Sequence, residues 1–174
     1  AQESRGRGDV YKRQTCALWA DKIQFRLGSG LSVLQPGEAT EIIIAGMGAE
    51  TVLEILDAAP WVRNEQYNFV FVPATKHSVL RKGLAQRGFA LKSETLCRAA
   101  GRLYTVINAQ YTGRAAEPTG LACLCGKTQG QPEAQAYREQ QLVKLKKYRL
   151  GLAPGPQADG VDALIQEMED GLWP

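Results

Sequence analysis

The most restrictive feature of the sequence is a run of three isoleucines that passes into a glycine-containing turn and then into a helical pattern. Residues 42–44 are all isoleucine. They are followed by Ala45, Gly46, Met47 and Gly48, and an apolar helical period begins at Thr51. Three adjacent β-branched residues suit a strand that is buried on both faces, as in a parallel sheet. Glycines at the carboxyl end of such a strand permit a tight turn and a close approach to a ligand. The pattern therefore predicts an α/β sheet with a binding loop at 45–48.

An upstream stretch repeats this arrangement. Ile23 to Leu27 is predicted to form a strand, and Gly28, Ser29, Gly30 and Leu31 to form the loop at its carboxyl end. Two such loops on neighbouring parallel strands would be adjoining walls of one crevice. Many strand-to-helix turns contain glycine and bind nothing, so the spacing alone leaves a purely structural role open.

The rest of the chain predicts a partial sheet domain followed by a pair of helices. Helices are expected over 50–58 and 78–87, a third strand over 68–72, and an antiparallel strand pair over 89–96 and 102–109. This order is that of the second half of a doubly wound sheet that ends in an antiparallel hairpin. Residues 113–132, rich in Gly, Thr and Pro, are predicted to be a linker. Residues 133–150 and 159–171 read as amphipathic helices, so that 133–174 would form a helical hairpin.

The first 14 residues are treated separately. They have no apolar period, and the run from Arg7 to Gln14 resembles a translated adapter sequence, so we exclude them from fold reasoning. We expect the native chain to enter near Thr15, part-way through its domain, which makes 15–112 the sheet domain. Before residue 23 there is no glycine-rich loop of the dinucleotide-binding kind.

Composition limits the partners and the compartment. The chain has 174 residues and a net charge of +3, which permits an anionic partner without demanding one. It has no apolar run of about 20 residues and no secretory signal, so we predict a cytoplasmic protein without a membrane partner. Its four cysteines are read as reduced thiols. Cys123 and Cys125 lack a second ligand pair, and His77 is the single histidine, so no metal is predicted. Oligomeric state stays open.

Charged residues give one candidate interface. Lys144, Lys146, Lys147 and Arg149 lie within six residues and could contact RNA phosphates. The alternative is a solvated helix face whose cations favour the carboxyl end of the helix dipole. The cations at 81, 82, 98 and 102 are read as rim charges. His77 is a weak candidate for acid–base chemistry, and a surface-loop histidine is the favoured interpretation, so the catalytic residues stay unknown.

Several motifs together resemble one family. They are Arg26-Leu27-Gly28-Ser29-Gly30-Leu31, Pro36-Gly37-Glu38-Ala39, Ile43-Ile44-Ala45-Gly46-Met47-Gly48, Leu80-Arg81, Arg87-Gly88-Phe89, Gly101-Arg102-Leu103-Tyr104 and the helical tail from Tyr137. Over about residues 15–172 the sequence resembles the bacterial tRNA (adenine-22-N(1))-methyltransferases, which use S-adenosyl-L-methionine. The resemblance implies a Rossmann-like (class I) methyltransferase sheet, here lacking its N-terminal half, with a C-terminal helical hairpin.

The resemblance also implies roles for residues. Gly28, Ser29 and Gly30 would lie by the adenine of the cofactor, and Leu31 would also bind the cofactor. Residues 45–48 would lie where its methionine end meets the target base. The basic tail would hold tRNA. The family's acidic residue at position 29 is Ser29 here, and its glutamine before Pro73 is Val72. We therefore expect a fragment of a tRNA adenine-N(1) methyltransferase that binds the cofactor poorly alone. The alternatives are a non-catalytic RNA-binding protein on a degenerate methyltransferase scaffold, or another α/β nucleotide-binding enzyme.

Overall fold

The computed structural model describes residues 17–19 and 21–174. The chain divides into two units, 1–35 and 36–174. The adapter-like segment predicted at 1–14 lies outside the described residues.

The second unit is built on a four-stranded mixed sheet. Its strands are β1 (Glu41–Ala45), β2 (Asn68–Val72), β3 (Phe89–Ala99) and β4 (Arg102–Tyr111), in the spatial order β1-β2-β4-β3. β1 and β2 are parallel, with Ile43 opposite Val70, whereas β4 is antiparallel to both β2 and β3. A parallel pair that continues into an antiparallel hairpin is the predicted arrangement of this part of the chain.

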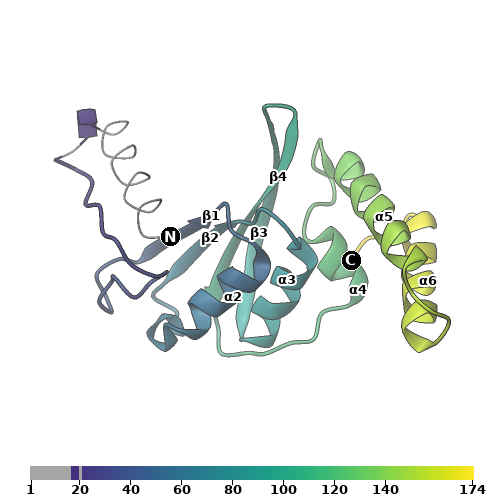
Figure 1. The fold of residues 1–174 in the computed structure, drawn as a ribbon, viewed down its shortest axis with the longest axis horizontal. Helices are drawn as coiled ribbons and strands as arrows, with labels where there is room; N and C mark the ends of the chain where they lie inside the picture. The colour runs from purple at the N-terminus through teal and green to yellow at the C-terminus, as the bar shows by residue number, and fades with distance from the viewer. Residues whose placement is uncertain (1–16, 20) are drawn as a thin grey trace. The chain divides into compact units, whose positions relative to one another are not determined.

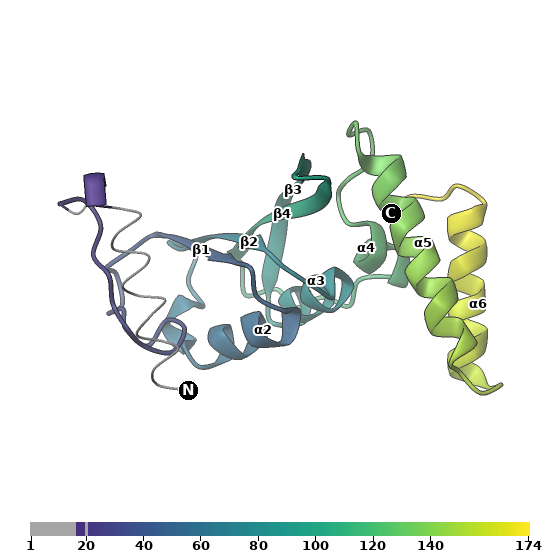
Figure 2. The same ribbon diagram turned by 45° about the horizontal axis from the view of Figure 1, so that its top comes forward.

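Two helices follow the parallel strands and lie side by side on one face of the sheet. They are α2 (Ala49–Asp57) and α3 (His77–Gln86), and the short 3₁₀ turn η2 (Pro60–Val62) follows α2 (Figure 1). Their close approach depends on Gly83, because a Cβ there would come 2.4 Å from the Leu53 side chain. Figure 2 shows both helices on the same side of β1 and β2.

The burial of β1 corrects one expectation. Ile42 and Ile44 are 5% and 6% exposed, but Ile43 between them is 69% exposed. Successive side chains of a strand point to opposite faces, and α2 and α3 lie on one face only. Within the described residues, the isoleucine run is therefore buried on one face, and the prediction of burial on both faces was wrong.

The β3–β4 hairpin closes with a two-residue turn. Ala99 pairs with Arg102, and the residues between them, Ala100 and Gly101, have φ angles of +47° and +74°. Two consecutive positive φ values are those of a type I′ turn, whose twist matches that of the flanking strands. At the other end, the register shifts between Leu91 and Ser93, which makes Lys92 the extra residue of a bulge.

The C-terminal part contains three helices. Helix α4 (Gly120–Cys125) lies inside the segment predicted as a linker, and α5 (Ala134–Leu150) and α6 (Pro156–Glu169) form the predicted helical pair. A shared apolar cluster joins all three helices through Leu121, Cys125, Leu145 and Met168. A second cluster, made of Leu96, Ala134 and Tyr137, packs the start of α5 against the β3–β4 hairpin.

In the first unit, the described residues form a 3₁₀ turn and a series of tight turns. The 3₁₀ turn is η1 (Ala17–Trp19), and residues 23–27 have no strand pairing. The strand predicted over Ile23 to Leu27 was therefore wrong. A short apolar alternation forms a strand only when a neighbouring strand pairs with its backbone, and Leu27 is 73% exposed.

Candidate functional site

The loop after β1 is the predicted cofactor loop, and it lies at the carboxyl end of a parallel strand as expected. Gly46 has a φ of +77°, and a Cβ there would meet no heavy atom within 4 Å. The glycine is therefore required by the backbone angle and not by crowding. Ala45, Gly46 and Met47 are exposed, and Gly48 is half-buried at the start of α2. The loop thus presents backbone at Ala45 and Gly46, together with one large side chain, that of Met47, which is 40% exposed.

Backbone contacts fasten this loop to the one after β2. The Gly46 N–H donates to the Val72 carbonyl over 2.9 Å, and the Ala74 N–H donates to the Met47 carbonyl over 2.9 Å. Gly48 and Thr75 form a parallel bridge. The Lys76 ammonium also pairs with the Glu50 carboxylate, which holds the Glu50 pKa below its usual range. Residues 45–48 and 73–76 therefore form one rim of the sheet.

A cleft of about 810 Å³ opens beside this rim. We call it the α3–α5 cleft; its walls are residues 73–79, residues 102–104 at the start of β4, and one face of α5. The α5 face carries Tyr137, Gln141, Lys144 and Tyr148, which are spaced at three or four residues and so lie on one side of the helix.

The cleft is positively charged. Lys76, Arg102 and Lys144 line it, and none of the lining residues in the described part of the chain is acidic. Glu50 neutralises Lys76, but no ion pair of the described residues involves Arg102 or Lys144. The first turn of α3 also borders the cleft, and a helix N-terminus favours an anion. The cleft is therefore suited to a phosphate.

His77 lies in the wall of the cleft and is held on both ring nitrogens. Its Nε2 lies 3.2 Å from the Pro73 carbonyl, which makes this nitrogen the donor, and its Nδ1 lies 3.2 Å from the Tyr137 hydroxyl. Burial, with a contribution from Arg81 and Lys144, lowers the His77 pKa to about 4. The interpretation of His77 as a surface-loop residue was wrong. It is a neutral, half-buried residue that starts α3 and contacts α5.

Behind His77 is a buried ion pair. Arg81 is 1% exposed and donates from Nε and Nη2 to Glu94, at 3.0 Å and 2.7 Å from Oε2. Its Nη1 donates to the carbonyls of Cys123 and Leu124, and Nη2 also donates to the Tyr137 hydroxyl. The expectation of a rim charge was therefore wrong for Arg81, although it holds for Lys82, whose exposed ammonium pairs with Glu117.

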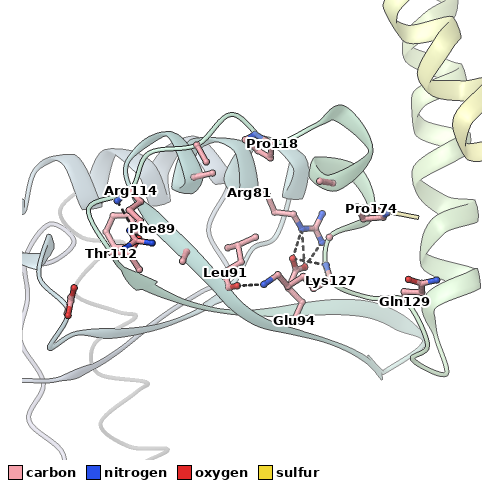
Figure 3. A pocket seen from close by; sticks show the side chains of 16 residues that line it. Arg81, Phe89, Leu91, Glu94, Thr112, Arg114, Pro118, Lys127, Gln129 and Pro174 are labelled. Atoms are coloured by element: carbon pink, nitrogen blue, oxygen red, sulfur yellow. Dashed lines mark hydrogen bonds and ion pairs between the residues drawn. The ribbon is translucent and has the colours of Figure 1, made fainter. Parts of the chain in front are cut away.

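A second cavity of about 910 Å³ lies beside this ion pair. Figure 3 shows Arg81 and Glu94 at this cavity, pointing toward each other. Lys127, which also lines it, donates from Nζ to the Leu91 carbonyl and from its backbone N–H to Glu94. In this cavity the charges of Arg81 and Glu94 are paired with each other, and the Lys127 ammonium is bonded to a backbone carbonyl. For this reason we take the α3–α5 cleft, and not this cavity, as the candidate site for an anionic ligand.

The four predicted RNA-binding cations are in different surroundings. Lys144 lines the cleft, and Lys147 is exposed on α5. Lys146 pairs with Glu169 over 2.5 Å and Arg149 with Asp162 over 2.7 Å, so both side chains reach α6. Of these four cations, Lys144 and Lys147 have no ion pair in the described part of the chain.

The loop predicted to contact the cofactor's adenine belongs to the first unit. Gly28, Ser29 and Gly30 are exposed in a tight turn, and Leu31 is buried. The Ser32 N–H donates to the Ser29 carbonyl over 3.1 Å, and Gly30 has a φ of +54°. At Gly28 a Cβ would come 2.0 Å from the Val33 side chain, so the turn needs glycine there.

Sequence reasoning did not assign a site role to Arg102, Tyr104 or Gln141. All three line the cleft, and their signal was weak because they come from β4 and α5, which are separated in sequence.

Cys123 and Cys125 are buried free thiols, and burial raises the pKa of each. Within the described residues, there is no group of three or more potential metal ligands, and no helix is long and apolar enough to cross a bilayer.

Comparison with known proteins agrees with this architecture. A family described as methyltransferase domain matches residues 11–107. The tRNA (adenine(22)-N(1))-methyltransferase of Bacillus subtilis (strain 168) is 31% identical over 126 residues, which are 72% of this chain and 52% of that protein. The chain thus spans about half the length of this curated relative.

Solved structures share the fold. The B. subtilis tRNA methyltransferase TrmK has a TM-score of 0.68 at 22% identity, with 92% of this chain and 72% of that chain covered. A putative tRNA methyltransferase of Streptococcus pneumoniae, in complex with S-adenosyl-L-methionine, has a TM-score of 0.68 at 18% identity, with 92% and 73% covered. These likenesses confirm the predicted Rossmann-like fold class.

The family match covers more than half of the chain, and it includes β1 with the glycine loop that follows it. The predicted resemblance to the tRNA adenine-22 methyltransferases is confirmed by the B. subtilis relative. The chain belongs to the methyltransferase-domain family.

Proposed function

We propose that the full-length protein is an S-adenosyl-L-methionine-dependent methyltransferase that methylates N1 of an adenine in tRNA. The observation that carries the proposal is the glycine loop 45–48 at the carboxyl end of β1, beside a positively charged cleft. The name of the B. subtilis relative supports the substrate and the position of methylation. The S. pneumoniae structure, named as a complex with S-adenosyl-L-methionine, supports the cofactor.

The residues of the loop fit such a cofactor. Gly46 leaves open space where a side chain would stand, and its positive φ turns the backbone at the strand end. In this proposal Ala45, Gly46, Met47 and Gly48 contact the methionine end of the cofactor, and Gly28, Ser29, Gly30 and Leu31 its adenosine end. When bound, the cofactor would supply a sulfonium methyl group, which adenine N1 attacks as the carbon–sulfur bond breaks.

The work of the protein in this reaction is positioning. The adenine N1 lone pair is already nucleophilic, so the chain need not supply a base for the attack. In-line alignment of the nucleophile and the methyl group contributes much of the rate of such a step. A small, glycine-lined wall admits a flat base that has been turned out of an RNA stack. Lys144, Lys146, Lys147 and Arg149 would hold the tRNA through its phosphates.

The test is transfer of radiolabelled methyl groups from S-adenosyl-L-methionine to tRNA by the full-length protein, with the modified nucleoside identified by mass spectrometry. We expect N(1)-methyladenosine. Gly46→Ala should raise the Kd for the cofactor at least about tenfold, because a side chain at positive φ distorts the loop.

Gly37→Ala is the matched control. Gly37 also has a positive φ (+83°) and open space around its Cβ position, but it lies outside the loop. The Kd of the Gly37→Ala variant for the cofactor should stay near that of the parent protein. Absence of methyl transfer by the intact protein, together with undiminished tRNA binding, would instead favour a non-catalytic RNA-binding protein on this scaffold.

A further inference from the structure

The cleft and the proposed cofactor loop share a wall. Residues 73–76 line the α3–α5 cleft. Two of them also contact the loop 45–48: the Ala74 N–H donates to the Met47 carbonyl, and Thr75 forms a parallel β-bridge with Gly48. A polynucleotide that delivers one base to the loop 45–48 would therefore extend its backbone along the mouth of the cleft. The neighbouring nucleotide would be within reach of the groups that line it.

We propose that the α3–α5 cleft binds the unpaired RNA nucleotide next to the one that is methylated. Its phosphate lies at Arg102 and Lys144, and its base lies against Tyr148. This inference rests on the proposed function and deepens it, because it assigns a second nucleotide subsite to residues of β4 and α5.

The charge of the cleft supports the phosphate position. Arg102 and Lys144 approach from different elements, β4 and α5, and the ion pairs of the described residues leave both side chains unneutralised. The N-terminus of the ten-residue helix α3 adds a partial positive charge on the third side. An anion in the cleft therefore meets attraction from three elements and no lining carboxylate in the described residues.

The remaining lining groups suit a base. Tyr148 is 51% exposed and Tyr104 is half-buried, so both rings have surface available for stacking. Gln141 also lines the cleft and is 7% exposed, and its amide nitrogen has no hydrogen-bond partner among the described residues. A buried donor without a partner costs free energy, and the acceptor atoms of a nucleobase would satisfy it.

The test uses the 174-residue chain and a fluorescein-labelled single-stranded oligoribonucleotide about eight nucleotides long, without cofactor. Affinity is measured by fluorescence anisotropy at several salt concentrations. Arg102→Ala and Lys144→Ala should each weaken binding about 5-fold or more, and each should reduce the slope of log K against log salt by about 0.7. Circular dichroism melting checks that each variant is folded.

Two matched controls remove one exposed positive charge elsewhere. The controls are Lys92→Ala and Arg114→Ala. Lys92 lies at the β3 bulge, Arg114 follows β4, and neither residue lines the cleft. Both should bind the oligoribonucleotide within about 2-fold of the parent. If the controls weaken binding as much as Arg102→Ala and Lys144→Ala, binding depends on overall charge and the subsite is refuted.

Base stacking is tested separately from charge. Tyr148→Ala should weaken binding about 5-fold or more, whereas Tyr148→Phe, which keeps the ring, should restore it. An oligoribonucleotide that contains a photoreactive thiouridine should crosslink to peptides that carry Tyr104 or Tyr148. Crosslinks confined to peptides outside the cleft would overturn the assignment.

The outcome is independent of methyl transfer, because no cofactor is present in these measurements. If the full-length protein does not methylate tRNA, the proposed function fails whatever the oligoribonucleotide does. If it methylates tRNA while Arg102→Ala and Lys144→Ala bind the oligoribonucleotide like the controls, only the subsite is wrong.

Discussion

One residue of this chain is constrained because its backbone passes close to a buried ion pair. This residue is Gly126. It has a φ of +62°, and a Cβ there would come 2.5 Å from both Arg81 Nε and Glu94 Oε2. Glycine at this position is therefore required twice, by the backbone angle and by the space that the ion pair occupies.

We expect Gly126→Ala to lower the free energy of unfolding by about 3 kcal/mol or more, since it adds strain at positive φ and displaces a buried ion pair. Gly130→Ala isolates the first of these effects, the backbone strain. Gly130 has a φ of +80° with no heavy atom within 4 Å of the Cβ position, so it carries the strain alone. Urea unfolding of the two variants measures the difference, and equal losses would mean that the ion pair accommodates the methyl group.

His77 gives a prediction about pH. Its pKa is lowered from 6.5 to about 4 in the folded chain, chiefly by burial. The unfolded chain therefore binds the proton more readily between these values. The stability contribution of neutral His77 is complete above about pH 6.5 and decreases as the pH falls toward 4.

Because the sequence has a single histidine, its imidazole proton resonance can be titrated without ambiguity. The midpoint should be near pH 4. In urea unfolding, His77→Gln should lose less stability than the parent chain between pH 6.5 and pH 4.5. A midpoint near 6.5 would mean that the ring is solvated and that its contacts with Pro73 and Tyr137 do not persist in solution.

Among the elements, those with a strong local pattern were predicted from the sequence. The strands and helices from Glu41 to Tyr111 are at the expected places because apolar periodicity, Pro60, Pro73 and Gly88 mark their limits. The helical pair was predicted for the same reason. The predicted strand at 23–27 was wrong because strand formation depends on a partner that local sequence does not specify.

The parts of the site that could not be predicted depend on contacts between distant segments. Arg81 was read as a surface charge because nothing near it in sequence shows that Glu94, α4 and Tyr137 surround it. Helix α4 is six residues long, and its apolar residues fit no clear period. Arg102 and Lys144 line one cleft only because the β3–β4 hairpin and α5 meet in space.

The hairpin turn offers a prediction at this scale. Ala100 occupies a left-handed conformation at φ +47°, which alanine adopts at a cost and asparagine more readily. Ala100→Asn should therefore stabilise the chain by about 0.5–1 kcal/mol. Thermal unfolding measures the gain. Ala100→Val, with a β-branched side chain at positive φ, should destabilise it, and the opposite order would contradict the type I′ assignment.

In the second unit as a whole, residues 36–174, the helical pair is tied to the sheet by buried polar bonds as well as by apolar packing. Arg81 alone connects α3 to β3, α4 and α5. Trp173 packs against both C-terminal clusters and against Arg138, whose guanidinium carbon is 5.6 Å from the ring centroid. Separating α5 and α6 from the sheet would leave buried charges without partners, which is costly.

We therefore expect the sheet and the helical pair to unfold in one transition. Three tryptophans allow the test: a Trp19→Phe/Trp61→Phe chain reports on Trp173, and a Trp19→Phe/Trp173→Phe chain reports on Trp61. Fluorescence-detected urea unfolding of the two chains should give the same midpoint, after correction for any stability difference measured by circular dichroism. An earlier midpoint for Trp173 would show that the helices separate first.

The backbone bonds between the loops at 45–48 and 73–76 also bear on the order in which ligands bind. A ligand that immobilises one loop lowers the entropy cost of immobilising the other, through the Ala74–Met47 bond and the Gly48–Thr75 bridge. Under the proposed function, thermodynamic reciprocity then requires the methyl donor and RNA to enhance each other's affinity by the same factor. Cooperativity between the two proposed substrates would in this way come from main-chain hydrogen bonds between the loops.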